Sequence, residues 1–223
     1  MNGNDSIKMS VAIICLSLSL STFAQSNWTW RNPLPQGNVL NGIVSTGNQY
    51  LAVGEVGMAI TSPDGLQWTL VHTGSFSTLY AVTWTGKQFV TVGSNGTILT
   101  SPDGITWIAR NSGVTTSLIS LTWADSQLVA VGDNGMILAS RDGINWTQRN
   151  SGIKASLFSV ARGDIQWVAV GDSGTILSSL DGLIWTRQIS NTALKLASIT
   201  WADSVWVAVG SSKIIITSAN GVT

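Results

Sequence analysis

The sequence predicts an all-β protein made of one repeated unit, and three observations support this fold class. A glycine turn, followed by an Asp-Gly turn and a tryptophan, recurs at a fixed 39-residue step and is clearest between Val131 and Thr147. Runs rich in β-branched and aromatic residues alternate with Gly, Asn and Asp at short, regular spacing. No window of useful length has the 3.6-residue apolar spacing of a helix. A repeat of this length indicates stacked copies of one supersecondary unit.

Three sets of residues mark the repeat. The first turn is marked by Gly54, Gly93, Gly132, Gly171 and Gly210. The second turn is marked by Asp64, Asp103, Asp142, Asp181 and Asn220. A tryptophan follows the second turn in four copies, as Trp68, Trp107, Trp146 and Trp185. We expect these tryptophans to belong to the hydrophobic core.

Each unit contains four short extended runs, which are clearest in the second unit. They are Leu79–Trp84, Phe89–Val92, Thr97–Thr100 and a run that starts at Trp107. The Asn-Gly pair at 95–96 predicts a tight hairpin loop in which Gly supplies a positive φ. The Ser-Pro-Asp-Gly segment at 101–104 predicts a turn in which Pro sets φ and Asp accepts hydrogen bonds from nearby backbone N–H groups.

Equivalent positions keep their size through the repeat. A leucine position is filled by Leu40, Leu79, Leu118, Leu157 and Leu196, and a small position by Gly42, Ala81, Ser120, Ser159 and Ser198. A bulky position holds Tyr50, Phe89, Leu128, Trp167 and Trp206. Small residues on an innermost strand allow strands to converge at a crowded axis. Four strands in a unit of roughly 40 residues are typical of a β-propeller, and five copies predict five blades.

The N-terminal residues predict secretion. Lys8 precedes an apolar run that leads into Ser21–Ala24, where small residues occupy the positions that a signal peptidase reads. We expect a signal peptide over residues 1–24 and one propeller domain over residues 25–223, located outside the cell, in the periplasm or at the cell surface. The apolar run is too short for a stable membrane span. Cys15, the only cysteine of the chain, lies in this run. The mature chain would therefore contain no disulfide and no thiol nucleophile.

The two ends of the repeat region are complementary. The last unit reaches Thr223, one residue before its expected tryptophan, and the segment Trp28-Thr29-Trp30-Arg31 matches Trp146–Arg149. We therefore expect the N-terminal strand to complete the last blade and close the ring. The alternative is a fragment of a longer propeller.

Composition narrows the classes of partner. The 223 residues include 11 basic and 11 acidic side chains, for a net charge of zero, which argues against a nucleic-acid partner. Charged residues form only 10% of the chain, against roughly 25% in typical domains. This low charge, together with 23 glycines and 11 tryptophans, suits a rigid, turn-rich secreted protein.

The second turn with its tryptophan resembles the Asp-box, or BNR repeat, of sialidase-type propellers, although its spacing is one residue shorter. It reads Ser62–Trp68, Ser101–Trp107, Ser140–Trp146 and Ser179–Trp185. The wider unit resembles the propellers of photosystem II assembly factors and of many bacterial surface proteins, over nearly all of residues 28–223. The resemblance implies that Asp64, Asp103, Asp142 and Asp181 are structural turn residues, and the assembly-factor type implies a protein partner.

The residues do not assemble into a recognisable catalytic set. Sialidase chemistry needs an arginine cluster and a Tyr–Glu nucleophile pair, and no such set emerges from the repeat positions. Glycoside hydrolysis needs two facing carboxylates. Glu55, the only glutamate, shares a turn position with Asp133 and Asp172, so these three form either a loose acidic ring or caps of their own turns. His72 is the only histidine, so we expect no metal site and no cofactor.

Residues that break the repeat are the better candidates for binding. His72, Phe76, Lys154 and Lys195 fall on the loops that join one blade to the next, and Glu55, Asp133 and Asp172 fall on the glycine turns. Arg162 replaces a repeat tryptophan on the opposite face. Neutral drift at a permissive surface is the alternative for each of them. We expect a non-catalytic module that binds a protein or acts as a scaffold; the alternative is a propeller that binds or cleaves glycans.

Overall fold

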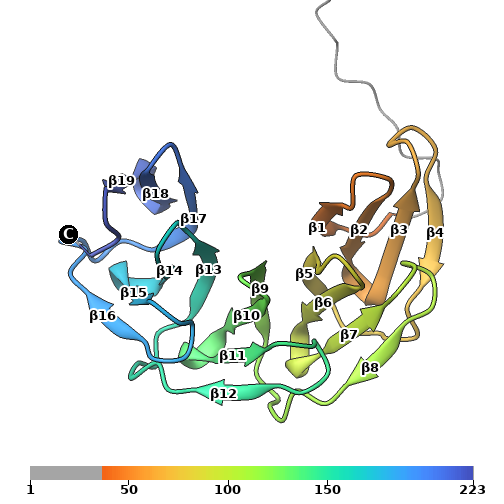
Figure 1. Ribbon diagram of the computed structural model, residues 1–223, viewed down its shortest axis with the longest axis horizontal. Coiled ribbons are helices and arrows are strands. Elements are labelled where there is room, and N and C mark those ends of the chain that lie inside the picture. The colour runs from red at the N-terminus through yellow and green to blue at the C-terminus, as the bar shows by residue number, and fades with distance from the viewer. Residues whose placement is uncertain (1–36, 223) are drawn as a thin grey trace, which may run out of the picture. The chain divides into compact units, whose positions relative to one another are not determined.

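The computed structural model describes residues 37–222, which form five antiparallel sheets that we call blades 1 to 5 in chain order (Figure 1). Within this range, helical structure is limited to five three-residue 3-10 turns. No helical segment of residues 37–222 has the length and hydrophobicity needed to cross a bilayer. The expected signal peptide and the expected closing strand around Trp28 lie outside the described residues.

Each blade is a meander in which consecutive strands pair. Blade 1 consists of β1 (Leu40–Ser45), β2 (Tyr50–Gly54), β3 (Met58–Ser62) and β4 (Thr69–His72). Blade 2 consists of β5 (Leu79–Trp84), β6 (Phe89–Gly93), β7 (Ile98–Ser101) and β8 (Ile108–Arg110). Blade 3 consists of β9 (Leu118–Ala124), β10 (Gln127–Gly132), β11 (Ile137–Ser140) and β12 (Thr147–Arg149).

The last two blades differ in strand number within the described range. Blade 4 consists of β13 (Leu157–Arg162), β14 (Trp167–Gly171), β15 (Ile176–Ser179) and β16 (Thr186–Gln188). Blade 5 has three described strands, β17 (Leu196–Ala202), β18 (Val205–Gly210) and β19 (Ile215–Ser218). A 3-10 turn joins the second and third strands of every blade: η1 (Glu55–Gly57), η2 (Ser94–Gly96), η3 (Asp133–Gly135), η4 (Asp172–Gly174) and η5 (Ser211–Lys213).

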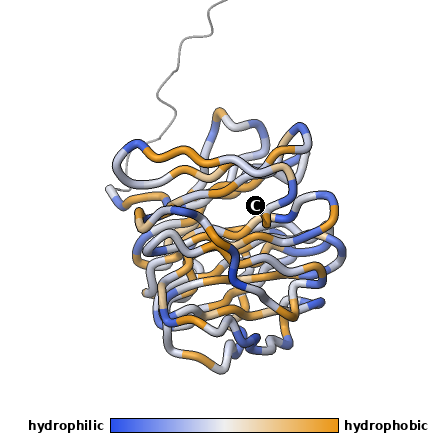
Figure 2. The backbone as a smooth tube through the Cα atoms, turned by 90° about the vertical axis from the view of Figure 1, so that its left-hand side faces the viewer, coloured by the Kyte–Doolittle hydropathy of each residue, from blue (hydrophilic) through white to orange (hydrophobic). Residues whose placement is uncertain are grey.

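The predicted all-β fold of four-stranded units is confirmed, with strand ends that differ by about one residue. The third strand of blade 2 begins at Ile98 instead of Thr97, because the Thr97 N–H closes the preceding turn on the Ser94 carbonyl at 3.0 Å. The predicted positive φ of Gly96 is also present, at 68°. Hydrophobic stretches follow the strands, and hydrophilic residues gather at many of the turns (Figure 2).

Neighbouring blades contact each other in chain order, through their first strands: β1 with β5, β5 with β9, β9 with β13, and β13 with β17. The small position of the repeat lies at this contact. A Cβ added to Gly42 would stand 3.2 Å from the Ala81 Cα, which is tighter than ordinary packing. Small side chains on the first strands therefore allow the backbones of adjacent blades to approach closely.

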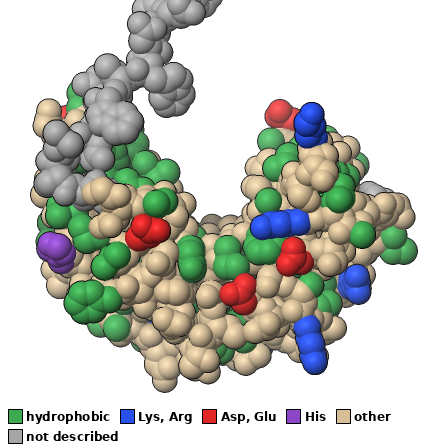
Figure 3. All heavy atoms as spheres, turned by 180° about the vertical axis from the view of Figure 1, so that it is seen from behind, with side chains coloured by type: hydrophobic (Ala, Val, Ile, Leu, Met, Phe, Trp, Pro, Cys, Tyr) green, Lys and Arg blue, Asp and Glu red, His purple; other side chains and the backbone are tan. Residues whose placement is uncertain are grey.

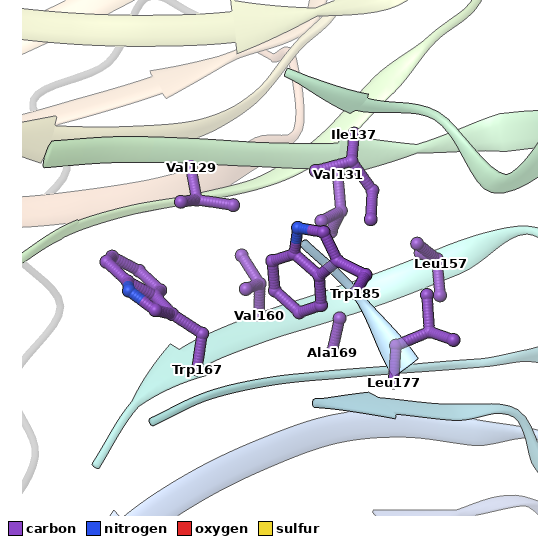
Figure 4. Packing of buried hydrophobic residues seen from close by; sticks show 9 residues of the cluster. All are labelled: Val129, Val131, Ile137, Leu157, Val160, Trp167, Ala169, Leu177 and Trp185. Atoms are coloured by element: carbon purple, nitrogen blue, oxygen red, sulfur yellow. The ribbon is translucent and has the colours of Figure 1, made fainter. Parts of the chain in front are cut away.

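The core consists of apolar clusters between blades, and the cluster between blades 3 and 4 is the most complete (Figure 4). Blade 3 contributes Val129, Val131 and Ile137, and blade 4 contributes Leu157, Val160, Trp167, Ala169, Leu177 and Trp185. Blade 3 is apolar on both faces, because Val129 and Val131 pack against blade 4 while Leu128 and Ala130 pack in the cluster shared with blade 2. Trp185 is only 8% exposed at the centre of this cluster.

A glutamine also links each blade to the next. The amide nitrogens of Gln88 and Gln127 donate to the carbonyl oxygens of Asp142 and Asp181, at 2.7 and 3.0 Å. Gln49 and Gln166 make the same bond to Asp103 and Asn220. The partners are 54 residues apart in every case, so the bond repeats with the blades.

Candidate functional site

The connections of each blade lie at two opposite ends. The 3-10 turns and the blade-to-blade loops lie together at one end, which we call the loop face. In blade 4, for example, the Asp172 N–H donates to the Ser156 carbonyl and the Gly174 N–H donates to the Leu194 carbonyl, both at 2.9 Å. Each such turn is held between the loop that enters its blade and the loop that leaves it. The first hairpins and the Asp turns lie at the other end, which we call the hairpin face.

The loop face is rigid because its turns and loops are tightly packed. In blade 1, the Gly57 N–H donates to the Ser77 carbonyl at 2.8 Å, and the Thr73 hydroxyl donates to the Gly57 carbonyl at 2.7 Å. Gly57 has a φ of +64°, and a Cβ added there would stand 1.9 Å from the Ser75 carbonyl oxygen. Only glycine fits this position. Side chains that project from such a scaffold are held in fixed places.

Four residues around this contact form what we call the blade-1 patch: Val56, His72 and Phe76, which are exposed, and Glu55, which is half-buried. Phe76 is 90% exposed and stands next to Ser77, whose carbonyl accepts the Gly57 N–H. Val56 is 49% exposed and stands on the other side of that bond, next to Gly57. His72 ends β4 at an exposed position and pairs with Met58. The patch therefore combines an aromatic ring, an aliphatic side chain and an imidazole.

Val56 is held in a strained backbone conformation. Its φ and ψ are 55° and 33°, in the left-handed region, where a β-branched residue is an outlier. The same position in the other blades holds Asn95, Asn134, Ser173 and Ser212, at φ between 52° and 57°. Backbone strain of this kind is concentrated at functional sites. Sequence analysis missed Val56, although its departure from Asn or Ser at the 39-residue step was visible.

The other predicted binding residues on the loop face lie around blades 3 to 5. The Asp133 carboxylate accepts a hydrogen bond from the Ser156 hydroxyl of the next blade at 3.0 Å. The Lys195 ammonium stands 3.9 Å from the centroid of the Phe158 ring, in a cation–π contact between blades 5 and 4. Lys154 is exposed, and Asp172 begins η4 at a half-buried position. Asp133 and Lys195 therefore connect adjacent blades.

The acidic turn residues do not form a metal centre within the described residues. The Glu55 carboxylate accepts a hydrogen bond from the Val39 N–H at 3.3 Å, and Asp133 bonds Ser156 as described above. Neither bond caps the residue's own turn, as one of the two expectations had it, because each joins the turn to a loop elsewhere in the chain. Residues 37–222 contain no group of three His, Cys, Asp or Glu side chains placed to hold a metal ion. In the view of Figure 3, the charged side chains are few and lie scattered among uncharged and hydrophobic ones.

The Asp turns on the hairpin face have the geometry of self-contained caps. The Asp142 carboxylate accepts hydrogen bonds from the Asn145 and Ile144 N–H groups, at 2.8 and 2.9 Å, and from the Ser140 hydroxyl. The Asn145 N–H is the main reason that the pKa of Asp142 lies well below its ordinary value. The Trp146 indole N–H donates to the Gly143 carbonyl at 3.0 Å. The pKa values of Asp64, Asp103 and Asp181 are lowered for the same reason, hydrogen bonds from backbone N–H groups.

Arg162, the predicted outlier on the hairpin face, joins blade 4 to blade 3. Its guanidinium forms an ion pair with Asp125 at 2.6 Å and also donates to the Gly163 carbonyl. One blade further on, the Trp201 indole N–H donates to Asp164 at 3.0 Å. Arg162 and Trp201 are equivalent in the repeat, as are Asp125 and Asp164. The departure from the repeat therefore preserves an inter-blade link with different chemistry.

Comparison with known proteins places the fold. No known protein family matches the sequence, and no curated protein matches it either. Among solved structures, YCF48 from Cyanidioschyzon merolae has a TM-score of 0.66 at 20% identity, over 84% of this chain and 70% of that one.

Two further similar structures have other origins. The WD40 β-propeller domain of Doa1 has a TM-score of 0.66 at 12% identity, over 85% of this chain and 68% of its own. The computationally designed protein Ika8 has a TM-score of 0.67 at 11% identity, over 80% of this chain and 57% of its own. The chain thus spans about six- to seven-tenths of the length of these structures. At these identities the similarity establishes the fold, and the fold is a β-propeller.

Proposed function

We propose that this protein is a non-catalytic binding module whose loop face binds a protein segment, with the blade-1 patch as the anchor. The exposure of Phe76, at 90%, is the observation that carries the proposal. Large aromatic side chains contribute much of the binding energy at protein interfaces. The Gly57–Ser77 hydrogen bond links the backbone next to Phe76 with the backbone next to a second exposed apolar residue, Val56, which is retained in spite of its strained backbone.

The surroundings of Phe76 favour a peptide-like ligand. The patch is mostly uncharged, with Glu55 and His72 at its borders, and its backbone is fixed by the bond between Gly57 and Ser77. A rigid site loses little conformational entropy when a ligand binds. A propeller of similar fold, YCF48 bound to D1 peptide, has a TM-score of 0.66 at 17% identity, over 83% of this chain and 64% of that one. We place the protein outside the cytoplasm, on the basis of the signal-peptide pattern in residues 1–24.

The proposal is tested by selecting peptide ligands from a display library on the immobilised protein. Binding of the selected peptides is then compared between the wild type and a Phe76→Ala, Val56→Asn double variant. We expect at least a tenfold loss of affinity, which corresponds to about 1.4 kcal/mol. A Leu180→Ala, Ile184→Ala variant is the matched control, because these residues are 72% and 75% exposed on an Asp turn of the hairpin face.

Two results would contradict the proposal. Peptides that bind the double variant as tightly as the wild type would place the site elsewhere. A glycan array run in parallel covers the alternative that this propeller binds carbohydrate. Specific glycan binding, with no peptide selected, would favour that alternative.

A further inference from the structure

Within residues 37–222, the contact between neighbouring blades recurs four times, and hydrogen bonds between first strands support it. Between blades 3 and 4, the Val160 N–H donates to the Ser120 hydroxyl at 3.3 Å, and the Thr122 hydroxyl donates to the Val160 carbonyl at 2.7 Å. Between blades 4 and 5, the Ile199 N–H donates to the Ser159 hydroxyl at 3.2 Å. A serine and a threonine two positions apart can therefore bond both backbone groups of one residue in the next blade.

Blade 5 carries the same two side chains on its own first strand. Ser198 and Thr200 are equivalent to Ser120 and Thr122, at twice the 39-residue step. Ser198 and Thr200 are exposed, whereas Ser120 and Thr122 are half-buried. The first strand of blade 5 therefore has the acceptor and the donor with which blade 3 binds blade 4, in a position that faces solvent.

The face of blade 5 that bears Ser198 is also apolar and exposed. Ser198 pairs with Val209 in the ladder between β17 and β18, so both side chains lie on one face of the blade. Val209 and Ile215 are 40% and 67% exposed, whereas their equivalents in blade 3, Val131 and Ile137, are 0% exposed and pack against blade 4. Blade 5 thus repeats the face with which blade 3 contacts blade 4, but exposes it.

Blade 1 exposes the other half of the same contact. Ile43 is equivalent to Val160, the residue whose N–H and carbonyl both bond to blade 3. Ile43 is 64% exposed, whereas its equivalents in the other blades are 4–8% exposed: Val82, Leu121, Val160 and Ile199. Leu40 and Tyr50 are each 38% exposed, at positions that are buried in blade 4. The exposed faces of blades 1 and 5 are therefore complementary in shape of repeat and in hydrogen bonding.

We propose that the exposed face of blade 5 binds blade 1 of a second copy of this protein, with Val209 and Ile215 packed against Ile43. Blades 1 and 5 stand at opposite ends of the row of blades, and every copy carries both faces (Figure 1). In this contact, the Ser198 hydroxyl accepts a hydrogen bond from the Ile43 N–H, and the Thr200 hydroxyl donates to the Ile43 carbonyl. Different surfaces of the two copies meet, so the association is heterologous and builds rings or open chains of copies.

Analytical ultracentrifugation of two variants, alone and mixed, tests the two faces separately. The mean mass of the wild type should rise with concentration, because each copy offers both faces. Ile43→Asp and Ile215→Asp each place an unpaired carboxylate in the contact, which disfavours burial, so each variant alone should stay a single chain. An equimolar mixture should form pairs and nothing larger, because only blade 5 of the first variant and blade 1 of the second remain intact.

Two further variants test the specificity of the contact. Ile105→Asp is the matched control, because Ile105 is 61% exposed on an Asp turn outside both faces, and it should associate as the wild type does. Ser198→Ala, Thr200→Val removes the two hydroxyls and leaves the face apolar. It should lower the association constant by at least about tenfold, because the Ile43 N–H and carbonyl of the second copy would be buried without partners. All variants should keep the near-ultraviolet circular dichroism spectrum of the wild type.

Three outcomes would overturn the proposal. A wild type with the mass of one chain at every concentration would show that the two faces do not join separate copies. Self-association of either aspartate variant alone would place the contact on another surface or between like faces. An associating wild type whose two variants form no pairs when mixed would show that blade 5 does not bind blade 1.

Discussion

Replacement of Val56 by asparagine should stabilise the protein, which is unusual for a substitution in a tight turn. The left-handed backbone at Val56, with φ of 55°, costs a residue with a β-carbon about 1–2 kcal/mol, and asparagine tolerates this conformation better. The side chain is 49% exposed, so its replacement loses about half of the apolar burial of a valine, or about 0.8–1.5 kcal/mol. The expected net gain is therefore at most about 1 kcal/mol.

Urea unfolding followed by tryptophan fluorescence measures this gain as a higher midpoint with an unchanged slope. For a chain of this size, about 1 kcal/mol corresponds to a rise of about 2–4 °C in the melting temperature. Asn95→Val is the matched control, because Asn95 occupies the equivalent position of blade 2 with φ of 56° and should be destabilised by a similar amount.

The two variants together show whether the backbone conformation or the side-chain contacts of Val56 determine its effect on stability. If Val56→Asn lowers stability and Asn95→Val leaves it unchanged, the left-handed backbone is not the source of the cost, and Val56 contributes through contacts of its side chain. If Val56→Asn raises stability and also weakens peptide binding, the valine is retained for binding at the expense of stability, a common compromise at functional sites.

Two further predictions concern the repeat itself. The carboxylates of Asp64, Asp103, Asp142 and Asp181 have pKa values in the folded protein below their ordinary 3.8, so their stabilising effect is present above that pH and is lost as the pH falls through the folded values. In the Asp142→Asn variant, the free energy of unfolding should therefore decrease less steeply below about pH 4 than in the wild type. Asparagine can make the equivalent bond without titrating, as Asn220 does when it accepts a hydrogen bond from the Val222 N–H. Denaturation at several pH values measures this, and the same pH dependence in both proteins would contradict it. Trp185→Ala should cost about 3–5 kcal/mol by opening a cavity between blades 3 and 4, and Trp146→Ala should cost less because it is half-buried. Near-native melting of the Trp185 variant would show that this indole does not support the core.

The sequence by itself determined the unit of the fold, because the signals that define a blade are local. Gly96 is needed because the backbone at that residue has a positive φ. Asp142 accepts hydrogen bonds from the N–H groups of Ile144 and Asn145, which are close to it in the chain. Such features repeat whenever the local sequence repeats. The same regular step predicted the four strands of each unit. It also predicted that the tryptophans of the Asp turns belong to the core, where Trp185 is buried, while Trp107 and Trp146 are half-buried and pack against it.

Only the tertiary structure decided how one blade contacts the next, because these contacts join residues far apart in the chain. The bond from Gln127 to the Asp181 carbonyl spans 54 residues, and the ion pair of Arg162 with Asp125 spans 37. The candidate site needed the same information. Phe76 stood out in the sequence as a departure from the repeat, but the strain at Val56 and its place beside the same loop depend on how η1 packs against residues 73–77. Backbone conformation at a turn and packing between loops are set by the whole fold, and a pattern of residue types does not contain them.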